Sequence, residues 1–325
     1  MEAKSLFRAI VVSAALLGAA CPAAAQVDYP RKSITLIVPS SPATGSDILA
    51  RRLGQKLGEK WKVPVIVDNR SGASGNIAFN AVAKSPPDGY TLLVTGDIII
   101  RNRSLYKDVP FDPIKDFAPI APLTAGAMAL VANPSVNAAS VKALINLLKE
   151  SPGKYNYASP GNGTLNHLTG ERFAFETRTK MLHVPYKGGA PAGAAIASGE
   201  VPVGLVAASS AIAFIKSGRA KAIAVTAARR IPLGPDWPTV AESGVPGFEA
   251  SNWVAIVAPA GTPRDIIAKV NADANRALKM SDVRERLAAV GAEAVGSTPE
   301  ELGATIRDDS ERYGKIVGLL KLKLD

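Results

Sequence analysis

The sequence is poor in the side chains that most catalytic and metal sites require. Among 325 residues there are one cysteine and two histidines, and aromatic residues make up 6% of the chain. A lone cysteine cannot form an intramolecular disulfide, and two histidines without an H-E-x-x-H motif do not make a typical zinc site. The nucleophile motif G-x-S-x-G, the phosphate-binding P-loop and the dinucleotide-binding glycine pattern are also missing. We therefore predict no catalytic residue, no cofactor and no metal.

Long apolar runs are missing as well, apart from one near the N-terminus. Residues 9–20 are apolar but too few to span a bilayer, and they lie between a basic start and the small residues Ala23–Ala25. This order is typical of a secretory signal peptide, so we predict that residues 1–25 are removed and that the mature chain begins at Gln26. Cys21 would leave with this segment. The sequence thus predicts a protein exported to the periplasm.

Charge and length narrow the class of protein further. The net charge is +10, yet lysine and arginine are scattered and few aromatic residues lie among them. A nucleic-acid partner is therefore not expected. The positive charge either lies on solvated helix faces or attracts a small anionic ligand. The length suits about two domains.

Strand-length apolar runs alternate with helix-period segments in the first third of the chain. Strands are predicted at Ile34–Val38, Val63–Val67 and Leu92–Thr95, with helices at Ile48–Leu57 and Ile77–Ala83 between them. A βαβαβ order of this kind favours a parallel sheet covered by helices. The fold class is therefore α/β.

The middle of the chain repeats this alternation, which predicts a second lobe. Its strands are predicted at Met128–Ala132, Tyr155–Ala158, Leu182–Val184, Val203–Ala207 and Ala220–Val225.

Two connections are predicted to cross between the lobes, the proline-rich stretch Phe117–Pro122 and Val225–Thr226. Lobe 1 would then comprise residues 26–122 and 227–325, and lobe 2 residues 123–226. A chain that leaves one lobe and later returns to it leaves a cleft that can close by hinge motion.

Three loops rich in glycine, serine and threonine follow predicted strands and precede predicted helices. They read PSSPATGSD at residues 39–47, SGASGN at 71–76 and SPGNGT at 159–164. Each places backbone N–H groups and hydroxyls at a helix N-terminus on the carboxyl edge of a sheet, where α/β folds bind ligands and anions are favoured. Two such loops facing each other across a cleft could bind a carboxylate.

Several longer stretches of the chain match one known protein family, and they occur in the same order as in that family. They include YPRKSITLIVP at 29–39, VDNRSGASGNI at 67–77, LYKDVPFDPIKDFAP at 105–119, SPGNGTLNHLTGE at 159–171 and IAVTAARRIPLGPDWPTVAESGVPGF at 223–248. Taken together, the chain from Tyr29 onward resembles the substrate-binding proteins of tripartite tricarboxylate transporters, the Bug-type receptors. The resemblance implies a two-lobed type II periplasmic binding protein fold, with a mainly parallel sheet flanked by helices in each lobe. It also implies a monomeric receptor that binds a small carboxylate or related solute in the interlobe cleft and delivers it to membrane transporter subunits.

The same resemblance implies a set of ligand-binding residues drawn from loops of both lobes. They are Thr44, Gly45, Asp47, Gly96, Asp97, Ser159, Gly161, Gly163, Thr164, His167, Tyr186, Ser209 and Ser210. Three of them also have a structural interpretation. Asp47 suits the first turn of a helix, where an acid is favourable, and His167 could fasten its helix to the adjacent strand. Tyr186 could be either an aromatic wall of the cleft or a buried tyrosine bonded to the backbone.

The chain departs from the family pattern in two places. The first loop usually reads P-x-P-P-G-G-x-x-D, whereas Ala43–Thr44 replaces the glycine pair here. Pro202 and Leu205–Val206 replace an aspartate and a Phe-Asp-like pair. These changes favour a ligand that is larger or more apolar than a simple dicarboxylate.

Two alternatives stay open at this level. A secreted hydrolase or isomerase could use cleft carboxylates, for which Asp47 and Asp97 are the candidates. A ligand-sensing component of a signalling system would share the fold and differ only in its partner.

Overall fold

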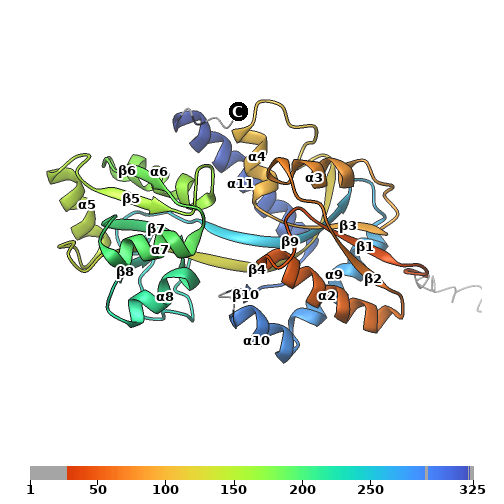
Figure 1. The fold of residues 1–325 in the computed structure, drawn as a ribbon. Helices are drawn as coiled ribbons and strands as arrows, with labels where there is room; N and C mark the ends of the chain where they lie inside the picture. The colour runs from red at the N-terminus through yellow and green to blue at the C-terminus, as the bar shows by residue number, and fades with distance from the viewer. Residues whose placement is uncertain (1–27, 290–291, 321, 323–325) are drawn as a thin grey trace, which may run out of the picture.

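The computed structural model describes residues 28–289, 292–320 and 322. The predicted signal peptide, residues 1–25, lies outside these ranges, as does Gln26. Within them, no helix has both the length and the apolar content needed to cross a bilayer. Figure 1 shows two lobes, joined by two long strands and with helix α11 running behind them.

The first lobe is built on a mixed sheet. Its strand order is β2 (Val65–Asn69), β1 (Ile34–Val38), β3 (Thr91–Gly96), β9 (Ser251–Pro259) and the first part of β4 (Phe117–Ala132). β1 pairs in parallel with β2 and β3, whereas β9 runs antiparallel to β3 and β4. The short β10 (Glu293–Ala294) pairs with β4. The predicted βαβαβ unit is confirmed.

The second lobe continues from the last part of β4. β4 pairs antiparallel with β7 (Val203–Ala207) and β8 (Lys221–Val225), and β7 pairs in parallel with β5 (Asn156–Ser159). β6 (Leu182–Pro185) completes this sheet beside β5. All five strands predicted for this lobe are present.

Strand β4 differs from its prediction in length. The stretch Phe117–Pro122 was expected to be a connection, but it forms the first part of one 16-residue strand that passes between the lobes. Proline cannot donate to a strand ladder, and the pairing with β9 shifts register between Pro119 and Ala121 and again between Pro122 and Thr124. These irregularities allow the prolines to lie within a strand.

The lobe boundaries at 122/123 and 226/227 stay a prediction, and the packing favours a later return to lobe 1. Val240, Val245 and Phe248 belong to the same buried cluster as Leu130 of the second lobe. The segment that follows β8 therefore packs with the second lobe, and a return near Ala250 fits this packing better than one at residue 227.

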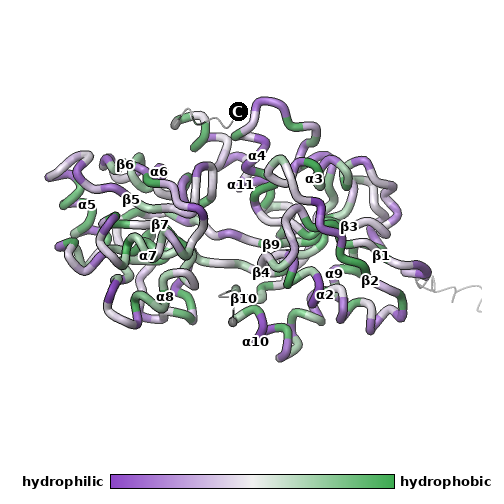
Figure 2. The backbone as a smooth tube through the Cα atoms, viewed as in Figure 1, coloured by the Kyte–Doolittle hydropathy of each residue, from purple (hydrophilic) through white to green (hydrophobic). Residues whose placement is uncertain are grey.

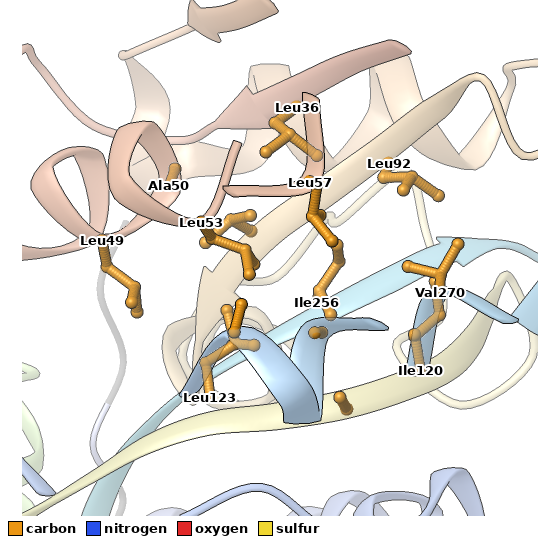
Figure 3. Packing of buried hydrophobic residues seen from close by; sticks show 14 of the residues in the cluster. Leu36, Leu49, Ala50, Leu53, Leu57, Leu92, Ile120, Leu123, Ile256 and Val270 are labelled. Carbon is orange, nitrogen blue, oxygen red and sulfur yellow. The ribbon is translucent and has the colours of Figure 1, made fainter. Parts of the chain in front are cut away.

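Helices cover both faces of the first sheet. α2 (Gly45–Trp61), α9 (Arg264–Leu278) and α10 (Ser281–Ala289) pack on one face. Figure 3 shows the α2 stripe of leucines meeting the strands there. The other face is covered by α3 (Asn76–Ala83), α4 (Ile98–Leu105) and α11 (Pro299–Leu320).

The second sheet is covered in the same way. α5 (Val141–Glu150) and α6 (Leu165–Thr177) pack on one face, and α7 (Gly189–Ser198) and α8 (Ala208–Lys216) on the other. Figure 2 shows hydrophobic segments gathered inside each lobe and hydrophilic stretches mainly at outer turns. Each lobe thus has its own core, as expected for α/β layers.

Candidate functional site

The register of the strands places the carboxyl ends of both parallel sets next to the boundary between the lobes. β7 ends at Ala207, opposite Met128, close to where β4 enters the second lobe. β3 ends at Gly96, opposite Val254, near the start of β9. Helices that follow these strands therefore begin at the side of each lobe that faces the other lobe. The predicted loops lie at this boundary.

The loop between β1 and α2 presents an open helix start. Thr44 is the N-cap of α2 but forms no side-chain cap bond, because its hydroxyl contacts Ser40 Oγ at 2.7 Å and Ser41 O at 3.0 Å. No hydrogen bond among the described residues uses the N–H groups of Gly45 or Ser46, and a Cβ added at Gly45 would meet nothing within 4 Å. This helix start can accept a ligand from solvent.

Asp47 holds this loop in place. It is 2% exposed, and its carboxylate accepts bonds from Ala43 N at 2.8 Å, Asn69 Nδ2 at 2.9 Å and Arg51 Nε at 3.1 Å. Burial alone would raise the pKa of Asp47, but the bonds from Arg51, Asn69 and Ala43 outweigh it and lower that pKa. Ala43, one of the two residues that replace the family's glycine pair, has a φ of 66°, a conformation that glycine adopts at less cost. These contacts support the structural interpretation of Asp47.

A buried ion pair follows β3. Asp97 and Arg101 are 5% and 9% exposed, and Arg101 Nε donates to Asp97 Oδ2 at 2.9 Å. Arg101 Nη1 also donates to the carbonyl of Gly163, in the second lobe, at 2.6 Å. The residue before Asp97 is Gly96, which lets the backbone of β9 approach closely, because a Cβ at Gly96 would lie 2.9 Å from Trp253 O. Arg101 was not among the residues predicted from the sequence. The signal that could have indicated it is the i,i+4 spacing from Asp97, but this spacing is also typical of solvated ion pairs on helices.

The loop between β5 and α6 is closed by its own hydrogen bonds. Ser159 Oγ accepts from Gly161 N at 3.1 Å and contacts His183 Nε2 at 2.6 Å. Thr164 caps α6, donating to Gly161 O at 2.7 Å and accepting from His167 N at 3.3 Å. The structure thus brings these predicted residues together, and it adds His183, which was not among the predicted ligand-binding residues.

His167 and His183 stack with their ring centroids 3.9 Å apart. His167 Nδ1 accepts from Gly163 N at 3.1 Å, so the ring fixes the residue that precedes the α6 cap. Burial lowers the pKa of His167, and burial together with the neighbouring His167 lowers the pKa of His183 to about 4. Both rings are therefore neutral near pH 7.

The remaining predicted residues lie at the starts of α7 and α8. Tyr186 donates its N–H to Ser159 O at 2.9 Å and its hydroxyl to Glu200 Oε1 at 2.8 Å. A Cβ on Gly189 would lie 2.7 Å from Ser210 Oγ, so the first turns of α7 and α8 abut. Ser209 precedes Ser210 in α8 and is partly buried. Three helix starts of the second lobe therefore share one surface.

The predicted residues of the two lobes are joined by few direct contacts. Among the described residues, no hydrogen bond links Thr44 or Gly45 to the second-lobe loops, and Arg101 supplies the bond to Gly163 O. The described residues also contain no group of three His, Cys, Asp or Glu side chains that could hold a metal ion.

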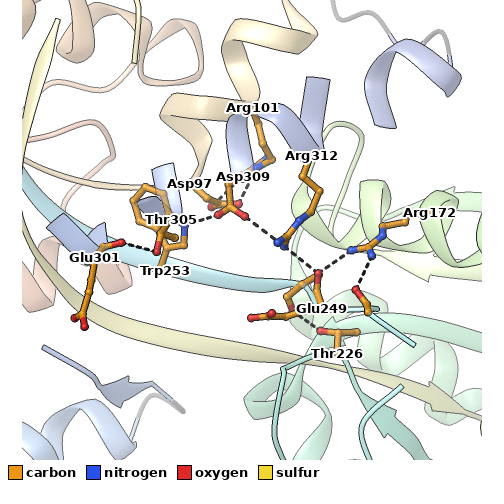
Figure 4. A network of polar contacts seen from close by, with 12 residues as sticks. Asp97, Arg101, Arg172, Thr226, Glu249, Trp253, Glu301, Thr305, Asp309 and Arg312 are labelled. Carbon is orange, nitrogen blue, oxygen red and sulfur yellow. Dashed lines mark hydrogen bonds and ion pairs between the residues drawn. The ribbon is translucent and has the colours of Figure 1, made fainter. Parts of the chain in front are cut away.

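A cleft of about 440 Å³ lies beside the connecting strands and contains none of the predicted site residues. It is bordered by β4, β9, α11 and residues 227–231. Trp253 Nε1 donates to Asp309 Oδ2 at 2.9 Å, and Arg312 Nη1 donates to Glu249 O at 3.2 Å (Figure 4). Burial raises the pKa of Asp309. This polar network lies where the lobes meet, and none of these residues was predicted as a site residue from the sequence.

Comparisons with known proteins agree with the geometry. A family model described as tripartite tricarboxylate transporter family receptor matches residues 49–322. The chain is similar to Protein BugT of Bordetella pertussis, with 35% identity over 319 residues that cover 98% of each chain. It is also similar to an adipate-bound structure from R. palustris, with 33% identity, a TM-score of 0.72 and coverage of 90% of this chain and 98% of that one. The malate-bound MatC of Rhodopseudomonas palustris has 29% identity, a TM-score of 0.70 and coverage of 89% and 100%.

Proposed function

Because this chain belongs to the receptor family of tripartite tricarboxylate transporters, we propose that it captures a small organic carboxylate between its lobes and delivers it to such a transporter. The family consists of periplasmic solute receptors, so the protein is a periplasmic binding protein. The finer proposals are cleavage of the signal peptide after Ala25 and a monomeric state. Thr44, Gly45, Gly161, Thr164 and their neighbouring predicted residues would contact the solute.

The observation that carries this proposal is the placement of helix starts on both sides of the lobe boundary. The uncapped first turn of α2 lies on the first lobe, and the starts of α6, α7 and α8 lie on the second. Helix N-termini offer free N–H groups and a positive dipole end, so they bind carboxylates without requiring lysine or arginine. Closure of the lobes would replace the ligand's water shell with these donors.

The ligand is proposed to be a carboxylate at the larger or more apolar end of the class. Similar proteins are solved with adipate and with malate. Here Ala43–Thr44 stands where the family usually has two glycines, and the buried pair Leu205–Val206 stands where a Phe-Asp-like pair is usual. Open space beside Gly45 leaves room for a longer ligand.

A catalytic role is not supported by the state of the two candidate carboxylates. Asp47 accepts bonds from Arg51, Asn69 and Ala43 N, and Asp97 is paired with buried Arg101. A general acid or base needs a lone pair or a proton free for the substrate. We therefore propose binding without turnover. A sensing role would share the capture step and differ only in the partner.

Thermal denaturation of the chain from Gln26 onward tests the ligand class. Malate, adipate and larger aromatic acids would be compared with their uncharged amides, which keep the size and lack the charge. A carboxylate at a concentration of 100 times its Kd should stabilise the native state by about 2.7 kcal/mol and raise the Tm by several degrees. The amides should have little effect, and the acid should be recovered unchanged. A flat Tm across all the acids would refute the proposed ligand class.

A further inference from the structure

We infer that Arg101 is a positioning residue for the ligand site, because its buried guanidinium holds the β5–α6 loop of the second lobe against the first lobe. This inference rests on the proposed function, since the loop that it holds is one of the proposed ligand-binding loops. Arg101 itself is not proposed to contact the solute.

The guanidinium is fixed on one side by its own helix. Asp97 precedes α4 as its N-cap, and Arg101 lies one turn later, so the carboxylate and the guanidinium meet at 2.9 Å and 3.4 Å. The two side chains are only 7% and 10% exposed. A two-point bond of this kind leaves Arg101 little freedom to turn.

The other side of the guanidinium reaches the second lobe. Arg101 Nη1 donates to Gly163 O at 2.6 Å, and Gly163 has a φ of 69°, the left-handed region that glycine tolerates. Gly163 lies next to Thr164, the N-cap of α6, and its own N–H is held by His167. Because both polar groups of this peptide segment are held, Arg101 sets the direction in which the α6 start is presented.

The bond lies in an apolar setting that excludes water. Leu165 and Leu168, in the first turns of α6, are 4% and 0% exposed and pack in the first-lobe cluster with Ile99 and Trp253. A charge-assisted hydrogen bond is stronger in such surroundings than at a solvated rim. A loop that is already held in place need not be ordered when the ligand binds, and this favours affinity.

The first test is Arg101→Lys. A lysine keeps the charge beside Asp97 but, with a single ammonium, lacks the planar fork that reaches Asp97 and Gly163 O together. The Kd for malate or adipate, whichever acid raises the Tm of the unmodified protein, should increase about tenfold or more. Arg172→Lys is the matched control. Arg172 makes a similar pair with Glu176, and it donates to Gly247 O and Glu249 O at the end of the segment that packs with the second lobe. The Kd of the Arg172→Lys variant for the same acid should therefore change little.

A distance measurement separates positioning from general damage to the fold. Spin labels at Glu59→Cys in α2 and Lys216→Cys in α8 report the separation of the lobes in ligand-free protein. Arg101→Lys should broaden this distance distribution, whereas Arg172→Lys should not. The double variant Asp97→Asn with Arg101→Met removes both charges, leaves no unpaired carboxylate and should broaden it too.

The outcomes are distinct. A Kd and a distance distribution that stay at their unmodified values in Arg101→Lys would overturn the inference, as would equal effects of Arg172→Lys. If the unmodified protein binds none of the acids, the proposed function fails, and the label distances in ligand-free protein still decide whether Arg101 positions the lobes.

Discussion

From the stacked rings of His167 and His183 we predict that the protein loses stability in mildly acidic solution. His183 contacts Ser159 Oγ at 2.6 Å and lies 3.9 Å from the ring of His167. Burial and the neighbouring ring lower the pKa of His183 from 6.5 to about 4. In the native state His183 therefore stays neutral over a pH range in which an unfolded histidine binds a proton.

The direction in which stability changes with pH follows from proton linkage. Between pH 6.5 and about 4 the unfolded chain binds more protons than the native chain, so stability is complete above pH 6.5 and falls as the pH is lowered through this window. A shift of this size corresponds to about 3 kcal/mol, and solvent screening of the half-buried ring reduces the expected loss to about 2 kcal/mol. The lowered pKa of His167 acts in the same direction.

Urea unfolding followed by tryptophan fluorescence at pH 7.5, 6.0, 5.0 and 4.5 measures this loss. His183→Gln keeps a polar group near Ser159 and removes the titrating ring, so its free energy of unfolding should depend less on pH. The pKa of Asp47 is lowered from 3.8, so Asp47 causes a loss of stability only at lower pH and does not contribute to the change expected for His183. Parallel curves for the unmodified protein and His183→Gln from pH 7.5 to 4.5 would refute the reasoning.

Two further predictions use matched pairs of substitutions. Gly204→Ala should destabilise the protein by about 1–3 kcal/mol in urea unfolding, because its Cβ would lie 2.1 Å from Ile196 Cδ1, whereas Gly45→Ala, beside open space, should cost nothing measurable. Equal midpoints for the two variants would contradict this packing. Thr164→Ala and Ser140→Ala each remove a helix N-cap that accepts a backbone N–H and should each cost about 1 kcal/mol. Only Thr164→Ala should also weaken binding of the carboxylate in a ligand titration, and equal Kd values for the two variants would contradict the placement of the site at α6.

The sequence was sufficient for most of the secondary structure, because each element carries a local signal. Leu49, Leu53 and Leu57 recur at helical spacing, and each is only 1–2% exposed in the core. The short apolar run at 34–38 is β1 as predicted. β2 starts at Val65 instead of Val63, because α2 extends to Trp61 and the chain then turns through Lys62 with a φ of 61°. The first residue of such a strand depends on where the preceding helix and its turn end.

The candidate site was only partly accessible from the sequence. The loops at 39–47 and 159–164 could be found because caps and glycines follow strands in a local pattern. The engagement of Asp47 by Asn69 could not, because those residues are 22 positions apart and meet only when β1 and β2 pair.

Periodicity and capping, which act within a few residues, determined the α/β elements and the loops at their ends. The tertiary structure alone decided that β4 runs unbroken between the lobes, that residues 240–248 pack with the second lobe, and that Arg101 reaches Gly163 across 62 positions. The physical reason is that such contacts depend on strand register and on the packing of one lobe against the other, and neither leaves a pattern in nearby residues.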